Sequence, residues 1–239
     1  MKKVLTTIGL ILTVVLLIIL MIACQGGIVG NGRVVTRTED IGKFTRLVIS
    51  GNFNVFLTQS DKPSLKLEMD ENLMDIVRIS EEGNTLRIDT KINILQAREK
   101  NLYISVKDLE KLDLSGAVKL TNDSVLEVES LGILAAGAVR LDMLIQARQL
   151  KLDLTGASEC DFRGKVDELR MQLSGAGDFD AFDLVAQDVE IDMSGAGSAR
   201  VYATEQLDVS ISGAGSVKYR GDPDVHKQIS GLGSLRRDY

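Results

Sequence analysis

Apolar and polar residues alternate through short segments that recur along most of the chain. The segments share the pattern apolar-x-apolar-Ser/Thr-Gly-Ala, and well-kept copies are Leu112–Ala117, Leu152–Ala157, Met171–Ala176, Ile191–Ala196 and Val209–Ala214. Alternation with a period of two predicts β-strands that bury one face. No helical period appears in these repeats, which excludes helical and leucine-rich solenoids.

One glycine marks each repeat. The marker glycines follow one another at intervals of 21, 19, 19, 20, 18 and 18 residues, and they are Gly116, Gly137, Gly156, Gly175, Gly195, Gly213 and Gly231. The positions four and two residues before the glycine, and four residues after it, are apolar in nearly every copy. Lys227, four residues before Gly231, is a clear exception. Each repeat is therefore predicted to be a strand, a Gly-Ala corner, a second strand and a polar turn.

The length of the repeat predicts how these strands are arranged. A propeller blade needs four strands, which is too many for 18 to 21 residues. One repeat per turn of a single-stranded parallel β-helix fits, because like residues then stack in ladders about 4.8 Å apart. A β-sandwich of hairpins is the alternative, but it predicts no fixed corner glycine. The sequence predicts an all-β solenoid.

Residues 34–108 are less regular. Residues 47–51 fit the frame of the repeat, and further alternating segments are Leu65–Met69, Val77–Ile79, Leu86–Asp89 and Leu102–Val106. The 65 residues from Gly51 to Gly116 correspond to about three turns with insertions. They are predicted to form the first turns or a cap, because the end of a solenoid must hide its open strand edge. Residues 70–77 are predicted to form a short helix over that end.

The N-terminus has the composition of a membrane-targeting segment. Lys2 and Lys3 precede an apolar run of 20 residues, Val4–Ala23, and Cys24 follows a small residue. This order is typical of a secretory signal and resembles a bacterial lipobox, in which Cys24 would be the lipid attachment site. Met21 stands where leucine is usual. An uncleaved signal anchor is the alternative, since 20 residues suffice to span a bilayer.

Both alternatives place everything after Cys24 on the extracytoplasmic side, because Lys2 and Lys3 favour the cytoplasm. We predict a signal peptide or signal anchor at residues 1–23 and a glycine-rich, flexible tether at residues 24–33. One β-helix domain follows at residues 34–235, and residues 236–239 form a charged tail.

The amino-acid composition argues against several classes of partner and site. The chain carries 28 Lys and Arg against 34 Asp and Glu, a net charge of −6, which argues against a nucleic-acid partner. Two cysteines and one histidine exclude a disulfide scaffold and a Cys/His zinc site. Cys160 falls in an apolar column and is predicted to be a small core residue. Asp178, Asp180 and Asp183 are weak candidates for calcium, because they lack the loop of a known calcium repeat.

A row of hydroxyls precedes the marker glycines: Ser115, Thr155, Ser174, Ser194, Ser212 and Ser230. No base accompanies them and no Gly-x-Ser-x-Gly elbow exists, so we interpret them as stacked hydroxyls that hydrogen-bond along the corner. Asp113, Asp153 and Asp192 share an outward column with uncharged neighbours between them, which avoids like-charge stacking. No catalytic residue, cofactor site or metal site is predicted.

Several segments together resemble one known family. They are Gly32–Thr36, Phe44–Gln59, Asp70–Leu73, Gly83–Ile88, the Ser-Gly-Ala-Gly corners, Gly221–Val225 and Ser230–Ser234. Over residues 30–235 the chain is similar to the putative auto-transporter adhesin, head GIN domain family. The resemblance implies a right-handed β-helix in an exported, often lipid-anchored bacterial protein. It supplies no catalytic residues to transfer.

The expected function is that of a membrane-anchored, extracytoplasmic and non-enzymatic adhesin or binding module. Its expected partners are the membrane and an extracellular glycan or protein, and it is expected to need no cofactor. One alternative is a structural protein whose turns stack end to end in the cell envelope. Another is a carbohydrate-active enzyme, which would need two carboxylates across a cleft.

Overall fold

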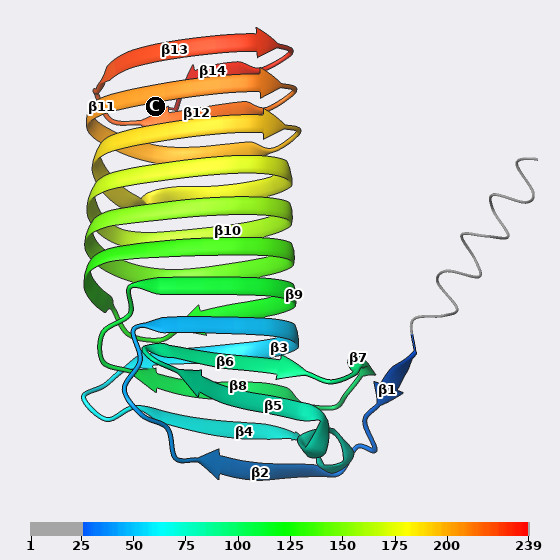
Figure 1. The fold of residues 1–239 in the computed structure, drawn as a ribbon. Helices are drawn as coiled ribbons and strands as arrows, with labels where there is room; N and C mark the ends of the chain where they lie inside the picture. The colour runs from blue at the N-terminus through cyan, green and yellow to red at the C-terminus, as the bar shows by residue number, and fades with distance from the viewer. Residues whose placement is uncertain (1–25, 239) are drawn as a thin grey trace, which may run out of the picture.

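The computed structural model describes residues 26–238, which form strands and one short 3-10 helix (Figure 1). The predicted membrane segment and Cys24 lie outside the described residues. Within residues 26–238, no helix is long and apolar enough to cross a membrane. The repeats form β9 (Lys111–Asn122), β10 (Leu126–Gly195), β11 (Ser198–Gly213), β12 (Ser216–Arg220), β13 (Asp224–Gly231) and β14 (Ser234–Arg237).

Successive repeats stack as parallel turns of the chain (Figure 1). β10 pairs with β9 so that Gly137 lies opposite Gly116, and β11 pairs with β10 so that Gly213 lies opposite Gly195. β13 continues the ladder on β11, with Gly231 opposite Gly213. This parallel, in-register pairing differs from the antiparallel pairing that a sandwich of hairpins needs. The repeat spacing read from the sequence is therefore the spacing of the stacked turns.

The inward columns form the core, as the alternation predicts. Four residues before the marker glycine, the side chains of Leu112, Leu152 and Ile191 are fully buried. Four residues after it, Leu120 and Val217 are equally buried. Each such side chain contributes about 1.5–3 kcal/mol by leaving water. Because every turn repeats the same columns, burial continues along the whole stack.

The marker glycines allow the backbones of neighbouring turns to approach at the corner. Gly175 has φ +138°, a conformation that L side chains rarely adopt. A Cβ atom at this position would lie 2.4 Å from the carbonyl oxygen of Gly156 in the preceding turn. Both the backbone angle and the space therefore require glycine, which explains why glycine recurs in every repeat.

The last four repeats carry a second glycine, in the sequence Gly-x-Gly. At Gly215, a Cβ atom would lie 2.1 Å from the sulfur of Met193 in the preceding turn. At Gly215 and Gly233 the space is filled by a side chain of the preceding turn, whereas at Gly177 and Gly197 the nearest atom is a backbone carbonyl oxygen of that turn. Packing between turns accounts for this glycine without any role for its backbone angle.

The N-terminal part caps one end of the stack. Strand β3 (Arg46–Gln59) belongs to the stack and pairs directly with β9, with Gly51 opposite Gly116. The expectation of about three turns between these glycines is therefore wrong. The cap consists of β2 (Val34–Glu39), β4 (Ser64–Asp70), η1 (Glu71–Ile76), β5 (Val77–Glu82), β6 (Thr85–Thr90), β7 (Asn93–Gln96) and β8 (Lys100–Val106).

Antiparallel pairing distinguishes the cap from the stack. β4 pairs antiparallel with both β2 and β8, and β5 pairs antiparallel with β6 through the turn at Gly83. The alternative of a cap over the strand edge is thus the one that the structure supports. The predicted short helix is present as η1, which buries Leu73, Met74 and Ile76.

Asp70 joins three segments of the cap. Its buried carboxylate accepts hydrogen bonds from the backbone N–H groups of Gly32 at 2.8 Å, Arg98 at 3.1 Å and Glu99 at 3.1 Å. Burial by itself would raise the pKa of Asp70, but these hydrogen bonds hold it below its usual value. Strand β1 (Gly27–Val29) pairs with β7, so part of the segment predicted as a tether is a strand.

The other end of the stack is an open strand edge. In the described chain β13 pairs with β11 and β14 pairs with β12, and the outer edges of β13 and β14 are unpaired. Lys227 lies opposite Val209 and occupies an inward column at this last turn. A charged residue that points inward at an edge discourages pairing with another chain, because its charge would be buried. The exception to the apolar column therefore marks the end of the stack.

The corner packing predicts that Gly175→Ala destabilises the protein strongly, by on the order of 3 kcal/mol, through backbone strain and overlap with Gly156. Thermal unfolding followed by circular dichroism measures the effect. Gly132→Ala is the matched control, because a Cβ atom there would meet its nearest neighbour at 3.9 Å. Equal unfolding temperatures for the two variants would contradict the role of the corner.

The open edge predicts that Lys227→Ile promotes association between chains, since it removes the charge from an unpaired strand. Light scattering over a range of protein concentrations should show an increase in average mass for this variant. Lys218→Ile, which changes an exposed lysine on a fully paired turn, should leave the mass close to that of the original protein. If the two variants associate equally, the inward position of Lys227 is not what protects the edge.

Candidate functional site

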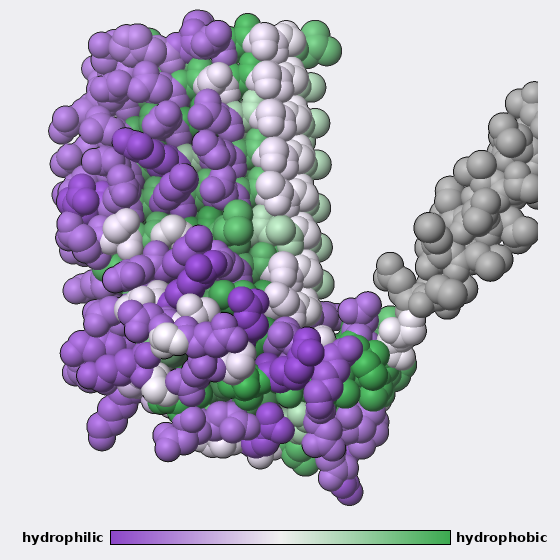
Figure 2. Space-filling model, in the orientation of Figure 1, coloured by the Kyte–Doolittle hydropathy of each residue, from purple (hydrophilic) through white to green (hydrophobic). Residues whose placement is uncertain are grey.

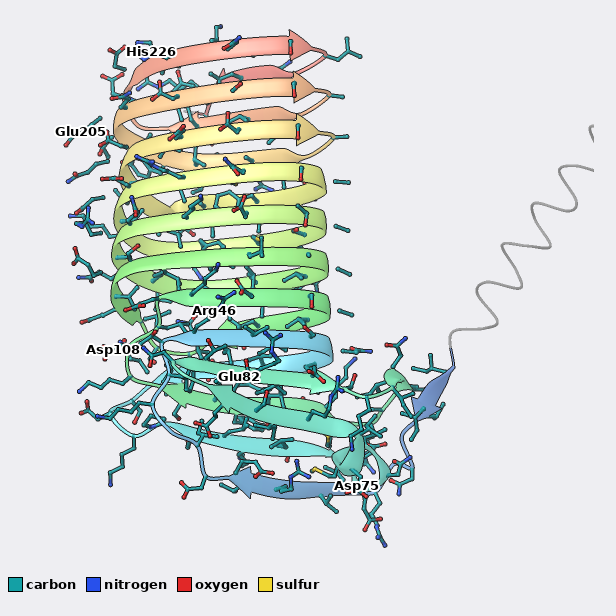
Figure 3. All side chains as sticks on the ribbon, viewed as in Figure 1. Arg46, Asp75, Glu82, Asp108, Glu205 and His226 are labelled. Atoms are coloured by element: carbon teal, nitrogen blue, oxygen red, sulfur yellow. The ribbon has the colours of Figure 1, made fainter. Side chains whose placement is uncertain are left out.

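A trough runs along the stack directly after the corner. The residue after every marker glycine but the last is a small, exposed alanine, as in Ala117, Ala138 and Ala157, and Leu232 follows Gly231. Two positions further on, the outward side chains of the first turns are longer, as in Lys119, Arg140 and Glu159, whereas later turns carry serine there. Because like positions stack, the alanines form a floor and the longer side chains form a wall beside it. Figure 3 shows short side chains along the edge of the stack where the strands of the near face end.

Along part of the stack this trough is an open groove with a volume of about 610 Å³. Its floor extends from Ala117 to Ala196, so the groove crosses several turns and lies parallel to the stack axis. At the end nearest the cap it is bounded by Asn52 and Asn54 from β3 and by Lys100 from β8. The groove is therefore built jointly by the stack and the cap.

Hydrogen bonds between side chains fix the cap end of the groove. The Lys100 ammonium donates to the Asn52 side-chain oxygen, and the Asn52 amide donates to the carbonyl of Ile94 at 3.3 Å. The Asn54 amide donates to the Asn101 side-chain oxygen at 2.9 Å. Burial lowers the pKa of Lys100 from its usual value. The amides are thus held in position before any ligand arrives.

Cations predominate in the half of the groove near the cap. Lys100, Lys119 and Arg140 line this half, whereas Glu159 and Asp178 line the half farther from it. Lys119 is exposed and has no ion-pair or hydrogen-bond partner among residues 26–238. Lys119 therefore offers a charge that no neighbouring acid neutralises.

The two carboxylates of the groove already have partners. Arg140 donates to Glu159 through Nε at 2.9 Å, and the Ser198 hydroxyl donates to Asp178. Both acids lie three residues after a marker glycine, so they are successive rungs of one column. This is not the arrangement of two carboxylates that face each other across a cleft, which glycoside hydrolysis needs.

An aromatic pair lies beside the groove on the same face. Phe56 of β3 follows the groove residue Asn54 by two positions and stacks on Tyr103 of β8, with ring centroids 4.9 Å apart. The ammonium of Lys66 lies 4.0 Å from the centre of the Tyr103 ring. Both rings are half-buried, so part of each remains available to solvent.

Glu68 connects this aromatic pair to the amides of the groove. Its Oε2 accepts hydrogen bonds from the Tyr103 hydroxyl at 2.8 Å and from the Asn101 amide at 3.2 Å. The bond from Tyr103, then that from Asn101, holds the pKa of Glu68 below its usual value. The same bond raises the pKa of Tyr103. The carboxylate is thus stabilised in its charged form.

A second outward column, five residues after the marker glycines, was not recognised in the sequence. Its stacked residues are Asp142, Asp161, Asp180, Arg200, Lys218 and Arg236. Three acids are followed by three cations, and counting five positions from each glycine would have found them.

The acids of this column are largely paired with arginine. Arg163 contacts Asp142 and lies 3.5 Å from Asp161, and Arg200 lies 3.0 Å from Asp180. Burial raises the pKa of Asp161; Arg163 opposes this effect, and the neighbouring acids add to it. Within residues 26–238, no group of three or more His, Cys, Asp or Glu residues is spaced to hold a metal ion. Asp178, Asp180 and Asp183 therefore belong to no such group among the described residues.

The remaining residues singled out in the sequence have mostly structural roles. Cys160 is buried in its apolar column, and burial raises the pKa of its thiol to about 12, which removes it as a nucleophile. The predicted ladder of hydroxyls is only partly formed. Ser115 donates to Ser50 at 2.8 Å, whereas Thr155 donates to the carbonyl of Ala135 at 3.2 Å.

The Glu68 contacts predict a dependence on pH. A carboxylate whose pKa is lowered in the folded state contributes stability above its unfolded pKa of about 4.3, and this stability is lost as the pH falls through the folded pKa. Tyr103→Phe should raise the pKa of Glu68 and reduce the free energy of unfolding at pH 7. NMR titration of the carboxyl carbon measures the pKa.

Tyr219→Phe is the matched control for this change. The Tyr219 hydroxyl has no hydrogen-bond partner among the described residues, so its removal should leave the pKa of Glu68 unaltered. A pKa of Glu68 that is the same in Tyr103→Phe and in the original protein would show that the hydrogen bond does not control the carboxylate.

Solved structures of similar proteins share this fold. A putative lipid binding protein from Parabacteroides distasonis ATCC 8503 is 28% identical, has a TM-score of 0.70, and the match covers 90% of this chain and 100% of that chain. A putative adhesin from Bacteroides fragilis NCTC 9343 is 22% identical with a TM-score of 0.76, and the match covers 89% of this chain and 100% of that chain.

A further similar structure is a putative adhesin from Parabacteroides merdae ATCC 43184, which is 22% identical with a TM-score of 0.68 and matches over 89% of this chain and 99% of that chain. No curated protein matches the chain. The model of the family described as putative auto-transporter adhesin, head GIN domain, matches residues 43–223. That match covers most of the chain, and the protein therefore belongs to this family.

Proposed function

We propose that the protein is an exported, membrane-anchored and non-enzymatic binding module that holds an acidic glycan chain in the groove. In this proposal residues 34–235 form a right-handed, single-stranded parallel β-helix domain. The in-register parallel pairing of the marker glycines supports this class of fold. Membership of an adhesin-like family supports a role at the cell surface or envelope.

Anchoring is proposed from the sequence of the N-terminus. Residues 1–23 would act as a signal peptide or signal anchor, and Cys24 would carry lipid if the signal is cleaved. Residues 24–33 would link the anchor to the domain through strand β1, and the predicted tail, residues 236–239, begins within strand β14. This arrangement places the groove on the extracytoplasmic side, where glycans of the envelope or of other cells are accessible.

The observation that carries the proposal is the direction of the groove. It crosses successive turns parallel to the stack axis, which suits an extended chain better than a compact small molecule. Lys100, Lys119 and Arg140 lie along one half of it and would attract carboxylate or sulfate groups. The fixed amides of Asn52 and Asn54 would hydrogen-bond hydroxyl groups.

The two alternative functions have less support. A carbohydrate-active enzyme would need its carboxylates on opposite sides of the bond to be cleaved, and Glu159 and Asp178 belong to one column. An end-to-end assembly would use the open edge of β13, where Lys227 opposes pairing. A lipid-binding role, suggested by the name of one similar protein, would have to use the surface, because side chains such as Phe162 and Phe179 fill the interior.

The proposal predicts that polygalacturonate, an acidic polysaccharide, binds the protein more tightly than neutral dextran, and that binding weakens as salt is added. Isothermal titration calorimetry measures both. Replacing Lys119 and Arg140 by alanine should reduce the affinity for polygalacturonate by about tenfold or more, which corresponds to about 1.4 kcal/mol.

Lys151→Ala provides the control, because Lys151 is an exposed lysine in the strand before the corner and does not line the groove. It should retain the affinity of the original protein. Equal losses in both variants would indicate a non-specific effect of charge. Absence of binding to polygalacturonate and to an array of other acidic glycans would reject the proposed function.

A further inference from the structure

An apolar surface lies at the small sheet formed by β1 and β7. Of the seven large apolar side chains that are exposed in residues 26–238, three belong to this sheet or to the residue before it. They are Val29, Ile92 and Leu95, which are 55%, 46% and 60% exposed. Figure 2 shows hydrophobic residues at this place, beside the point where the chain leaves the described part.

Contacts with the stack hold this surface in place. Ile94, between the exposed residues, is buried, and its carbonyl accepts a hydrogen bond from Asn52 of β3. Leu95 lies across the backbone of β1, since a Cβ atom at Gly27 would be 2.4 Å from the Leu95 Cγ. Leu95 and Ile92 are therefore held outward by a sheet that is itself pinned to the stack.

The position of this surface along the chain is informative. The apolar run Val4–Ala23 ends four residues before Gly27, the first residue of β1. Four residues of extended chain span at most about 14 Å. If the apolar run or a lipid on Cys24 enters the bilayer, β1 must lie within that distance of the membrane surface. This step rests on the membrane anchoring proposed above.

Positive charges beside the apolar side chains also suit contact with a membrane surface. Lys91 and Arg98 flank the segment that contains Ile92 and Leu95, and both are exposed. The Lys91 ammonium donates to the backbone carbonyl of Asp75 at 3.1 Å. Because a carbonyl carries no net charge, this hydrogen bond does not neutralise Lys91. Cations that border an apolar patch favour the boundary between anionic lipid head groups and acyl chains.

We propose that the β1–β7 surface docks on the membrane, with Val29, Ile92 and Leu95 inserted among the head groups and the upper acyl chains. A lipid bilayer is the occupant that the short connection to the apolar run favours. The contact would hold the stack at a fixed orientation on the membrane. The anchor would then act as one of two attachments and not as a free tether.

The absence of tryptophan from the sequence allows a direct test. The full chain is reconstituted in vesicles of phosphatidylcholine and phosphatidylglycerol, with a single tryptophan introduced as Leu95→Trp or Ile92→Trp. We expect blue-shifted emission and strong quenching when the lipids carry bromine on their acyl chains. Leu134→Trp is the control, because Leu134 is 41% exposed on the stack, away from β1 and β7, and should not be quenched.

Flotation of the vesicles on a density gradient separates the two proposals. If the protein floats with the vesicles and tryptophan emission is quenched only at positions 92 and 95, docking is supported. In a second outcome the protein floats while the tryptophans of Leu95→Trp and Ile92→Trp are quenched no more than that of Leu134→Trp. That result overturns the docking surface and leaves the anchor intact. Chain that does not float overturns the anchor, and the docking inference is rejected with it.

Discussion

The close approach of backbones at the corner is the contact on which the rest of the molecule depends. Each marker glycine brings its turn against the carbonyl of the turn before it, at a distance that leaves no room for a side chain. That contact sets the register of the ladder, and the register decides which residues stack. Burial of the inward columns then stabilises an arrangement that the corner has already defined.

Surface chemistry follows from the same register. From Ala117 to Ala196 an alanine after each marker glycine leaves a low floor. The longer residues two positions after Ala117, Ala138 and Ala157 form a wall, so a groove results from two columns of ordinary side chains. The cap completes it by supplying Asn52, Asn54 and Lys100, which belong to no repeat of the stack. The hydrogen-bonded network around Glu68 and Tyr103 lies where the regular part of the chain ends.

Prediction from the sequence located the core columns where the repeat supplied a register. The period of two placed Cys160 in the core and Lys227 at an exceptional inward position, because the marker glycine provides a common origin for counting. Between Gly51 and Gly116 no such marker exists. Alternation there identified strands such as Leu65–Met69 but not their antiparallel partners. Glu68 and Tyr103 meet only through that pairing, so their contact was beyond reach.

The stack also has a consequence for how such a protein can vary. Each turn contacts only the turns on either side of it, and every turn presents the same columns in the same order. A duplication or deletion between two corners, such as Gly156 and Gly175, would add or remove one step of the alanine floor while both ends stay unchanged. The length of the groove can thus change in evolution by whole turns of the stack, while the residue types that line it stay the same.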